Sequence, residues 1–237
     1  MNHINKEYLL NKYSKQIPLL YRYAQMIYEK NKVMNICGFD SVDEIFNQGI
    51  LGSILVFENA MNEYNHDFVN KKILDIGAGA GFPSVPLLIA LDNKFELVIM
   101  ESITKRCTFL ESVKNEFNLN LTIINARAEE INDYNSYFDY ICARAVGSVI
   151  KIYLMTNHHL AQNGYFILPK GKNYHAEIDE FKNKFTLEKD NISSFEYEDS
   201  INNENSSLVL IKKTKPTPYT RTKKVDISKF ADVFCWR

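Results

Sequence analysis

The chain has 237 residues, 46% of them hydrophobic and 24% charged, which is enough to bury one sizeable core, and we expect one main domain. Its net charge of −1 excludes a uniformly basic or acidic protein, but residues 212–237 hold eight lysines or arginines and two aspartates. This local charge of +6 fits a large anionic substrate at one edge of the molecule, or a solvated tail kept for solubility. Charge alone leaves both interpretations open.

The cysteines and the N-terminus indicate a reducing compartment. Four scattered cysteines form no CxxC pair and have no histidine at metal-ligand spacing, which argues against a disulfide framework or a metal site. The N-terminal residues lack an apolar signal region, and no apolar run approaches the roughly 20 residues that span a bilayer. We therefore expect a cytoplasmic protein. The cysteines are Cys37, Cys107, Cys142 and Cys235.

Residues 1–70 show apolar groups at helical spacing, and we predict a helical extension that covers one face of the domain formed by the rest of the chain. One helix is expected over residues 42–64. Asp40 or Ser41 is placed to cap it, and Glu44 is placed to close a capping box.

From Lys71 onward, apolar strands alternate with helical segments, which predicts a doubly wound, Rossmann-like α/β sheet with parallel strands. Near the end, residues 192–198 and 207–212 flank INNEN and indicate an antiparallel hairpin. An antiparallel finish favours the methyltransferase variant of this fold over a dehydrogenase. We divide the chain into a helical extension (1–70), a Rossmann-like core (71–213) and a basic tail (214–237). The remaining predicted strands lie at 71–76, 95–101, 121–125, 137–145 and 164–170, with helices from residue 84 and over 103–117.

A glycine-rich turn, DIGAGAG, comes directly after the first strand. Gly77, Gly79 and Gly81 allow a sharp turn and the close approach of a ligand. A purely structural turn, or NAD or FAD binding, also explains such a motif. The GxGxG spacing differs from GxGxxG, and Asp75 would repel a pyrophosphate but accept hydrogen bonds from a cationic amino-acid group. Both features favour S-adenosylmethionine as the cofactor.

Three further positions come after predicted strands. Glu101 ends the second strand, where a carboxylate can accept both ribose hydroxyls of an adenosine, although it also suits a cap for the next helix. After the third strand, residues 127–130 (RAEE) lie where an adenine would be flanked, with a charged helix start as the alternative. Arg144 leaves the fourth strand toward the crevice. It needs either a structural acid or a ligand as its partner.

Other residues argue against particular kinds of active site. The fourth strand lacks the Asn- or Asp-Pro-Pro-aromatic motif of amino-directed adenine methylases. Cys142 lies in mid-strand and is not placed as a nucleophile. We interpret the adjacent His158 and His159 as structural, on a helix that would point them about 100° apart.

Several motifs in chain order carry a resemblance to one family: DIGAGAGFPSVP, MESITKRCTFL, RAEE, FDYICARAVGS and LPKG. With them the chain resembles the guanine-N7 methyltransferases of small-subunit (16S) ribosomal RNA, the methyltransferase G family, also called glucose-inhibited division protein B. The resemblance runs from residues 31–38 into the tail, where KKTKPTPYTRTKK is similar to relatives from Gram-positive lineages. It implies a class I S-adenosylmethionine-dependent methyltransferase with an N-terminal helical extension.

The resemblance also implies site residues. Arg144 becomes the candidate catalytic residue, and Glu101 and Lys105 fit the acid and the Lys-Arg motif of the family. The chain departs from the family at residues 48–53, which keep only Ser53 of the pattern Arg-His-x-x-Asp-Ser, and Ser84 and Thr220 replace a usual glycine and proline. The implied cofactor contacts are Gly77, Phe82, Ala128, Glu129 and Arg144.

The implied reaction transfers a methyl group from S-adenosylmethionine to a guanine N7 in 16S ribosomal RNA, naked or within the small subunit, without a metal or a membrane. Guanine N7 has a lone pair and no proton, so the reaction depends on positioning and needs no general base. Two alternatives remain open. A small-molecule methyltransferase would favour an apolar lid over a basic tail, and a non-catalytic ribosome-associated protein would bind the cofactor without turnover.

Overall fold

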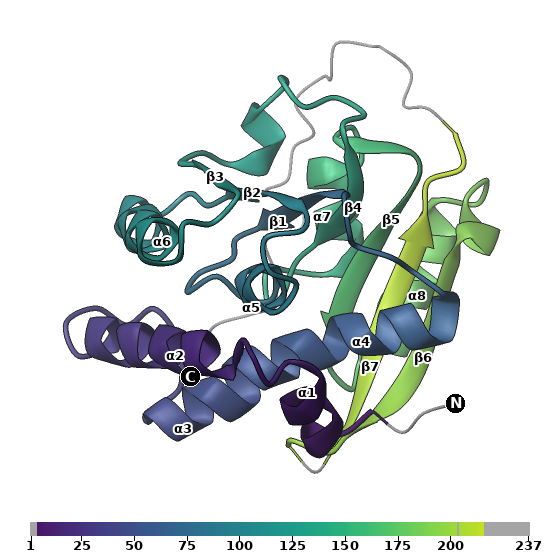
Figure 1. Cartoon of the computed structure of the whole chain (residues 1–237). Coiled ribbons are helices and arrows are strands. Elements are labelled where there is room, and N and C mark those ends of the chain that lie inside the picture. Colours follow the sequence, from purple (N-terminus) through teal and green to yellow (C-terminus); the bar gives the residue numbers. More distant parts are fainter. Residues whose placement is uncertain (1–3, 203, 216–237) are drawn as a thin grey trace.

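A computed structural model describes residues 4–202 and 204–215 and shows a seven-stranded sheet between two layers of helices (Figure 1). The strands are β1 (Lys72–Ile76), β2 (Glu96–Met100), β3 (Leu121–Ile124), β4 (Phe138–Cys142), β5 (Leu160–Lys170), β6 (Ile192–Asp199) and β7 (Glu204–Lys212). The helices are α1 (Lys6–Lys12), α2 (Ile17–Asn31), α3 (Val42–Glu44), α4 (Gly52–Tyr64), α5 (Ser84–Ala90), α6 (Thr104–Phe117), α7 (Val149–Thr156) and α8 (Tyr174–Lys184). A π-helical segment η1 (Ile45–Leu51) and the 3-10 turns η2 (Ala128–Glu130) and η3 (Lys189–Asn191) complete the described elements.

The sheet has the order β3-β2-β1-β4-β5-β7-β6. Strands β1 to β5 pair in parallel, whereas β7 lies antiparallel between β5 and β6. Parallel neighbours need a crossover, and α5, α6 and α7 each supply one. The predicted Rossmann-like sheet and its antiparallel finish are therefore confirmed.

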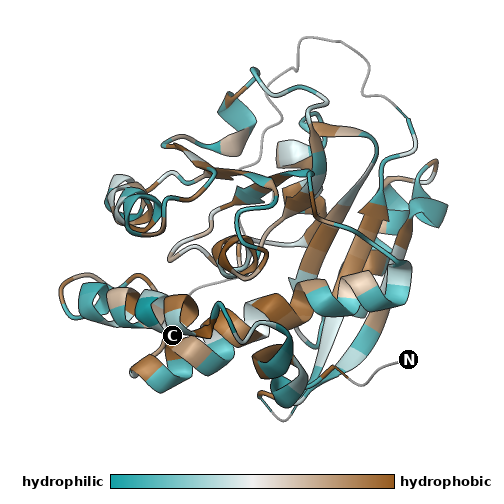
Figure 2. Ribbon diagram, viewed as in Figure 1, coloured by the Kyte–Doolittle hydropathy of each residue, from teal (hydrophilic) through white to brown (hydrophobic). Residues whose placement is uncertain are grey.

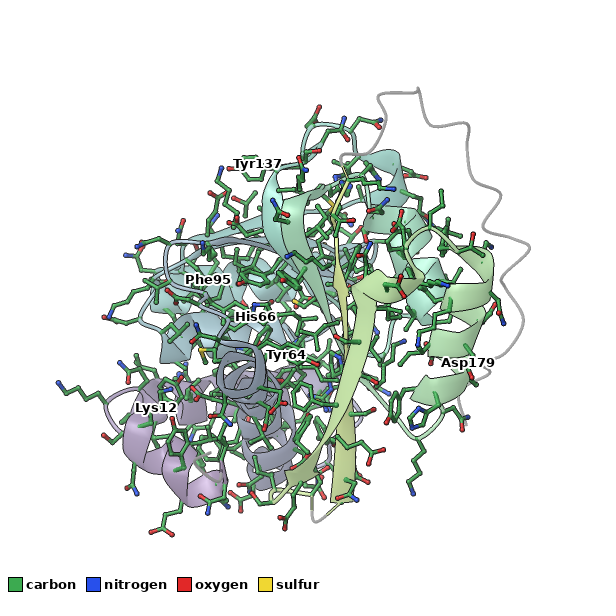
Figure 3. The ribbon with its side chains drawn as sticks, turned by 90° about the vertical axis from the view of Figure 1, so that its right-hand side faces the viewer. Lys12, Tyr64, His66, Phe95, Tyr137 and Asp179 are labelled. Carbon is green, nitrogen blue, oxygen red and sulfur yellow. The ribbon has the colours of Figure 1, made fainter. Side chains whose placement is uncertain are left out.

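Side chains alternate between the two faces of the sheet, as the two-residue period of a strand requires. Ile73 and Ile99 belong to the core beneath the N-terminal helices, whereas Leu74 and Val98 belong to the core beneath α7 and α8. Figure 2 shows hydrophobic residues concentrated on the strands and on α5, and more mixed colouring on the outer helices. Lys12 of α1 and Asp179 of α8 lie on opposite sides of the ribbon (Figure 3).

The N-terminal helices share one core with the sheet, as expected of a covering extension. Ser41 caps α3 by accepting a hydrogen bond from the Glu44 amide at 3.1 Å, while Glu44 accepts one from the Asp40 amide at 2.9 Å. The helix predicted over residues 42–64 is interrupted by η1. Hydrophobic period alone does not distinguish a π-helical turn from an α-helical one.

Several predictions concern membrane spans, metal sites and cysteines. Within residues 4–202 and 204–215, no helix is long and apolar enough to cross a membrane, and no cluster of three or more metal-ligating residues occurs. Cys37, Cys107 and Cys142 are free thiols, whereas Cys235 lies outside the described residues.

The basic C-terminal segment is described only at its root, since residues 216–237 lie outside the described part. Lys213, one of the eight cations of this segment, is buried, and its ammonium donates to the carbonyls of Asn157 at 2.8 Å and Leu160 at 2.5 Å. Burial lowers the pKa of Lys213 to about 8. This lysine belongs to the fold and is not available to an anionic partner.

Candidate active site

The residues predicted to form a site come after four neighbouring parallel strands. Gly77 follows β1, Glu101 follows β2, η2 comes after β3, and Arg144 follows β4. The Gly77 amide donates to Met100 O at 2.9 Å and the Glu101 amide to Ile124 O at 3.1 Å, so these strand ends are level. Ligands of open α/β sheets bind at this carboxyl edge, where the strand order reverses. The sheet reverses between β1 and β4.

The glycine loop is shaped by its packing. Gly77 has a φ of 63° and Gly81 a φ of 104°, in the left-handed region that glycine favours. A Cβ atom at Gly77 would lie 2.9 Å from a methyl carbon of Val146, and one at Gly81 would collide with the Tyr23 hydroxyl. That hydroxyl donates to Ala80 O, so a helix of the N-terminal extension supports the loop directly.

Glu101 joins the glycine loop to the start of α6. One carboxylate oxygen accepts from the Gly79 amide at 3.1 Å and the other from the Ile103 amide at 2.9 Å. The predicted alternative, an acid at the start of the next helix, is therefore also present, because Glu101 binds the amide of Ile103 just before α6. Each oxygen keeps a second lone pair, so the ribose contact stays a prediction. The implied Lys105 is exposed, and Arg106 is the cation that lies 3.7 Å from Glu101 Oε2.

Asp75 lies beneath the glycine loop, fully buried, so it presents no open surface to a ligand. Its Oδ2 accepts from the Ser84 hydroxyl at 2.6 Å and from the Ser84 amide at 3.2 Å. Burial raises the pKa of Asp75 to about 8, although both bonds from Ser84 lower it. The serine that replaces a usual glycine thus shapes the loop through Asp75. The predicted contact of Asp75 with a cationic group stays a prediction.

The turn η2 contains Ala128 and Glu129. Asn125, just before this turn, is hydrogen-bonded to Glu101 and Thr104. The Asn125 amide donates to Glu101 O at 3.0 Å and its oxygen accepts from Thr104 at 2.8 Å. Ala128 is buried. Glu129 Oε1 lies 3.8 Å from Arg127, while its Oε2 is buried with no hydrogen-bond partner in the described part of the chain. That unpaired acceptor fits a ligand donor such as an amino group.

Arg144 is half-buried, and no carboxylate of the described residues lies within 4.0 Å of its guanidinium. Its Nη1 donates to Ser53 Oγ at 3.3 Å, and the guanidinium lies 5.9 Å from the centre of the Phe82 ring. Burial lowers the pKa of Arg144, with Tyr197 and Asp199 acting in the opposite direction. An arginine without an acid partner retains donors for a ligand.

Phe82 connects the glycine loop to residues 48–53, the segment that departs from the pattern of the family that the chain resembles. A Cβ atom at Gly49 would lie 2.6 Å from Phe82 Cζ, so the ring fills the space beside this glycine. Ser53, the one residue kept from the Arg-His-x-x-Asp-Ser pattern, also contacts Arg144. We did not predict this contact between residues 91 positions apart. Its only signal was the retention of that serine.

Comparison with known proteins agrees with this arrangement. The chain is 36% identical over 163 residues to a protein of Mycoplasma capricolum, covering 68% of each chain. It is 33% identical over 217 residues to a protein of Clostridium tetani, covering 88% of this chain and 85% of the other. Both relatives are named ribosomal RNA small subunit methyltransferase G.

Solved structures agree on the fold. The O-methyltransferase from Bacillus cereus in complex with SAH aligns with a TM-score of 0.54 at 15% identity, covering 81% of this chain and 91% of that one. The tRNA (m1A58) methyltransferase TrmI from Aquifex aeolicus aligns with a TM-score of 0.50 at 15% identity, covering 68% of each. The fold is therefore that of Rossmann-like class I methyltransferases. The family profile described as rRNA small subunit methyltransferase G matches residues 16–209, and the chain belongs to that family.

Proposed function

We propose that this protein transfers a methyl group from S-adenosylmethionine to N7 of a guanine in 16S ribosomal RNA. The observation that carries the proposal is the convergence of Gly77, Glu101, η2 and Arg144 at the carboxyl edge of four parallel strands, in a chain of the methyltransferase G family. A ribosomal RNA substrate assigns the reaction to the cytoplasm.

The residues present fit this cofactor. The loop that begins at Gly77 leaves β1 with positive φ values at its glycines, so no Cβ atom blocks the approach of a ligand to its backbone. Glu101 has lone pairs for ribose hydroxyls. Glu129 Oε2, which no described residue contacts by a hydrogen bond, is an acceptor next to Ala128 for an adenine amino group. In this proposal Asp75 and Gly79 act mainly through the loop, because Asp75 is buried and the Gly79 amide is engaged by Glu101. Phe82 would pack against the bound cofactor.

The chemistry demands little of the protein. When bound, S-adenosylmethionine supplies the sulfonium methyl group that the N7 lone pair attacks. No proton leaves N7, so a general base is unnecessary, and the two buried acids next to the loop, Asp75 and Glu101, are already hydrogen-bonded within the protein. Arg144 would hold an acceptor of the cofactor or of the guanine, and such positioning would supply the rate.

The proposal is tested by incubating the full chain with methyl-labelled S-adenosylmethionine and either small ribosomal subunits or naked 16S RNA that lack the modification. We expect label in 7-methylguanine after hydrolysis of the RNA, in at least one of the two substrates. Cofactor binding without label in either RNA would identify a non-catalytic relative and refute the proposal.

A further inference from the structure

Two adjacent histidines at the junction of α7 and β5 contact both ends of the turn η2. His159 Nε2 lies 3.0 Å from the carbonyl oxygen of Ala128, and His158 Nε2 lies 3.2 Å from that of Ile131. The two rings are 3.8 Å apart, so they lie together and do not point about 100° apart from a helix. The helical prediction for this pair is wrong because α7 ends at Thr156, before the histidines.

The hydrogen-bond partners fix the tautomer of each histidine, and burial fixes the charge of the pair. A carbonyl oxygen only accepts, so each Nε2 that faces one carries the hydrogen. His159 is fully buried. Burial lowers the pKa of His159 to about 4, with His158 adding to the effect, and burial also lowers the pKa of His158. Both rings are therefore neutral donors at pH 7.

The turn that they contact has little structure of its own. Two backbone hydrogen bonds define η2: Glu130 N to Arg127 O at 3.0 Å and Ile131 N to Ala128 O at 3.3 Å. The residues on both sides of it, Arg127 and Ile131, are extended. A single 3-10 turn has poor hydrogen-bond geometry and is not stable alone. Its shape thus depends on contacts from outside.

We propose that His158 and His159 are positioning residues that hold η2 in the shape that receives the adenine of the cofactor. The inference rests on the proposed function, which puts the adenine beside Ala128 and Glu129. His159 fixes the carbonyl of the first residue of the turn and His158 the carbonyl just beyond its end. The His159 carbonyl also accepts from the amides of Tyr137 at 2.9 Å and Phe138 at 3.1 Å, so the pair is itself held by the start of β4.

The test is the affinity for S-adenosylhomocysteine, measured by calorimetry on the full chain, well below the melting temperature of every variant. His159→Leu removes the donor, and we expect the Kd to rise about 3- to 10-fold, the effect of one lost hydrogen bond. His159→Gln keeps an N–H group near the position of Nε2, and we expect a Kd within about twofold of the original. If His159→Leu does not fold, His158→Leu and His158→Gln carry the same expectation.

His66→Leu is the matched control. His66 is partly buried, whereas His159 is fully buried. The Nδ1 of His66 lies 3.3 Å from the Tyr140 hydroxyl, its Nε2 has no partner in the described part, and its ring packs against Tyr140 of β4 and Tyr165 of β5. We expect this variant to lower the melting temperature and leave the Kd unchanged. A merely structural role predicts the same pattern for His159→Leu, and that result would overturn the inference.

A second ligand distinguishes a change in the shape of η2 from a general loss of folding stability. S-inosylhomocysteine differs from S-adenosylhomocysteine only at the base, so the ratio of the two Kd values reports on the contacts of the adenine. We expect the Kd of S-inosylhomocysteine divided by that of S-adenosylhomocysteine to fall at least about threefold in His159→Leu, as loss of one oriented contact predicts. The same ratio should stay constant in His66→Leu. An unchanged ratio in His159→Leu refutes the positioning role. Failure of the unaltered protein to bind S-adenosylhomocysteine would instead refute the proposed function.

Discussion

Replacing Arg144 by alanine distinguishes a ligand-binding arginine from a structural one. In the protein the guanidinium has a 3.3 Å hydrogen bond to Ser53 and a 5.9 Å approach to the Phe82 ring, worth about 0.5–1 kcal/mol each. Among the described residues no carboxylate pairs with this half-buried cation, so its removal recovers part of its desolvation cost. We therefore expect Arg144→Ala to change the free energy of unfolding by about 1 kcal/mol or less.

The activity should respond far more. Charge-assisted hydrogen bonds to a cofactor or guanine contribute about 1.5–3 kcal/mol, which corresponds to a loss of about 10- to 150-fold in kcat/KM. Arg144→Lys keeps the charge but not the planar fork and should recover little of the activity. Ser53→Ala keeps the guanidinium and serves as the control. Transfer of labelled methyl groups and thermal unfolding are measured on the same preparations. An unfolded Arg144→Ala whose remaining folded fraction works at the original rate would refute this reasoning.

The remaining predictions concern the glycine loop, the buried Asp75 and the basic tail. In calorimetry the protein should bind S-adenosylmethionine or its demethylated product more tightly than NAD. Glu101→Ala should weaken that binding by about 1–3 kcal/mol. Gly77→Val should abolish it, because Gly77 has a positive φ and a Cβ atom there would meet Val146. The pKa of Asp75 is raised to about 8, above the ordinary value of about 3.9, so the folded state retains a proton that the unfolded chain has lost. Folding stability should fall as pH rises between about 4 and 8, by up to about 1.4 kcal/mol per pH unit, and Asp75→Asn should remove this slope in denaturant titrations. Deleting residues 216–237, which hold five lysines or arginines, should flatten the plot of log K for RNA against log salt by about 2–4 units.

Each of these has a contrary outcome. Preferred binding of NAD would reverse the interpretation of the glycine loop, and Glu101→Gln, which keeps one acceptor, should lose less affinity than Glu101→Ala. Parallel pH profiles of the original protein and Asp75→Asn would show that another group sets the slope. If the tail deletion lowers thermal stability and cofactor affinity together and leaves the salt dependence intact, the tail is part of the fold and not an RNA contact.

The fold was predictable because its signals are local. Apolar runs such as 95–101 and the turn residues between 192 and 212 specify strands and a hairpin, and parallel strands bring their carboxyl ends to one edge. Gly77, Glu101 and Arg144 could therefore be assigned to one site from their positions alone. Their order along the chain already fixed which strand each one follows.

The rest depends on tertiary contacts without a sequence period. Nothing in the spacing of residues 42–64 indicates that η1 departs from the α-helix, nor that Ser53 meets Arg144 across 91 positions. Lys213 counts toward the charge of the basic segment, but its burial cannot be read from that charge. The His158–His159 contacts with η2 were missed for the same reason, since only the folded chain brings residues 31 positions apart together.

The most direct test of the central claim is borohydride reduction and aniline cleavage of 16S ribosomal RNA, which breaks the strand at 7-methylguanosine. RNA treated with the protein and S-adenosylmethionine should show one cleavage at a guanine that is absent when either component is omitted and strongly reduced with Arg144→Ala. Identical cleavage patterns with and without the protein, on both naked RNA and assembled subunits, would contradict the account.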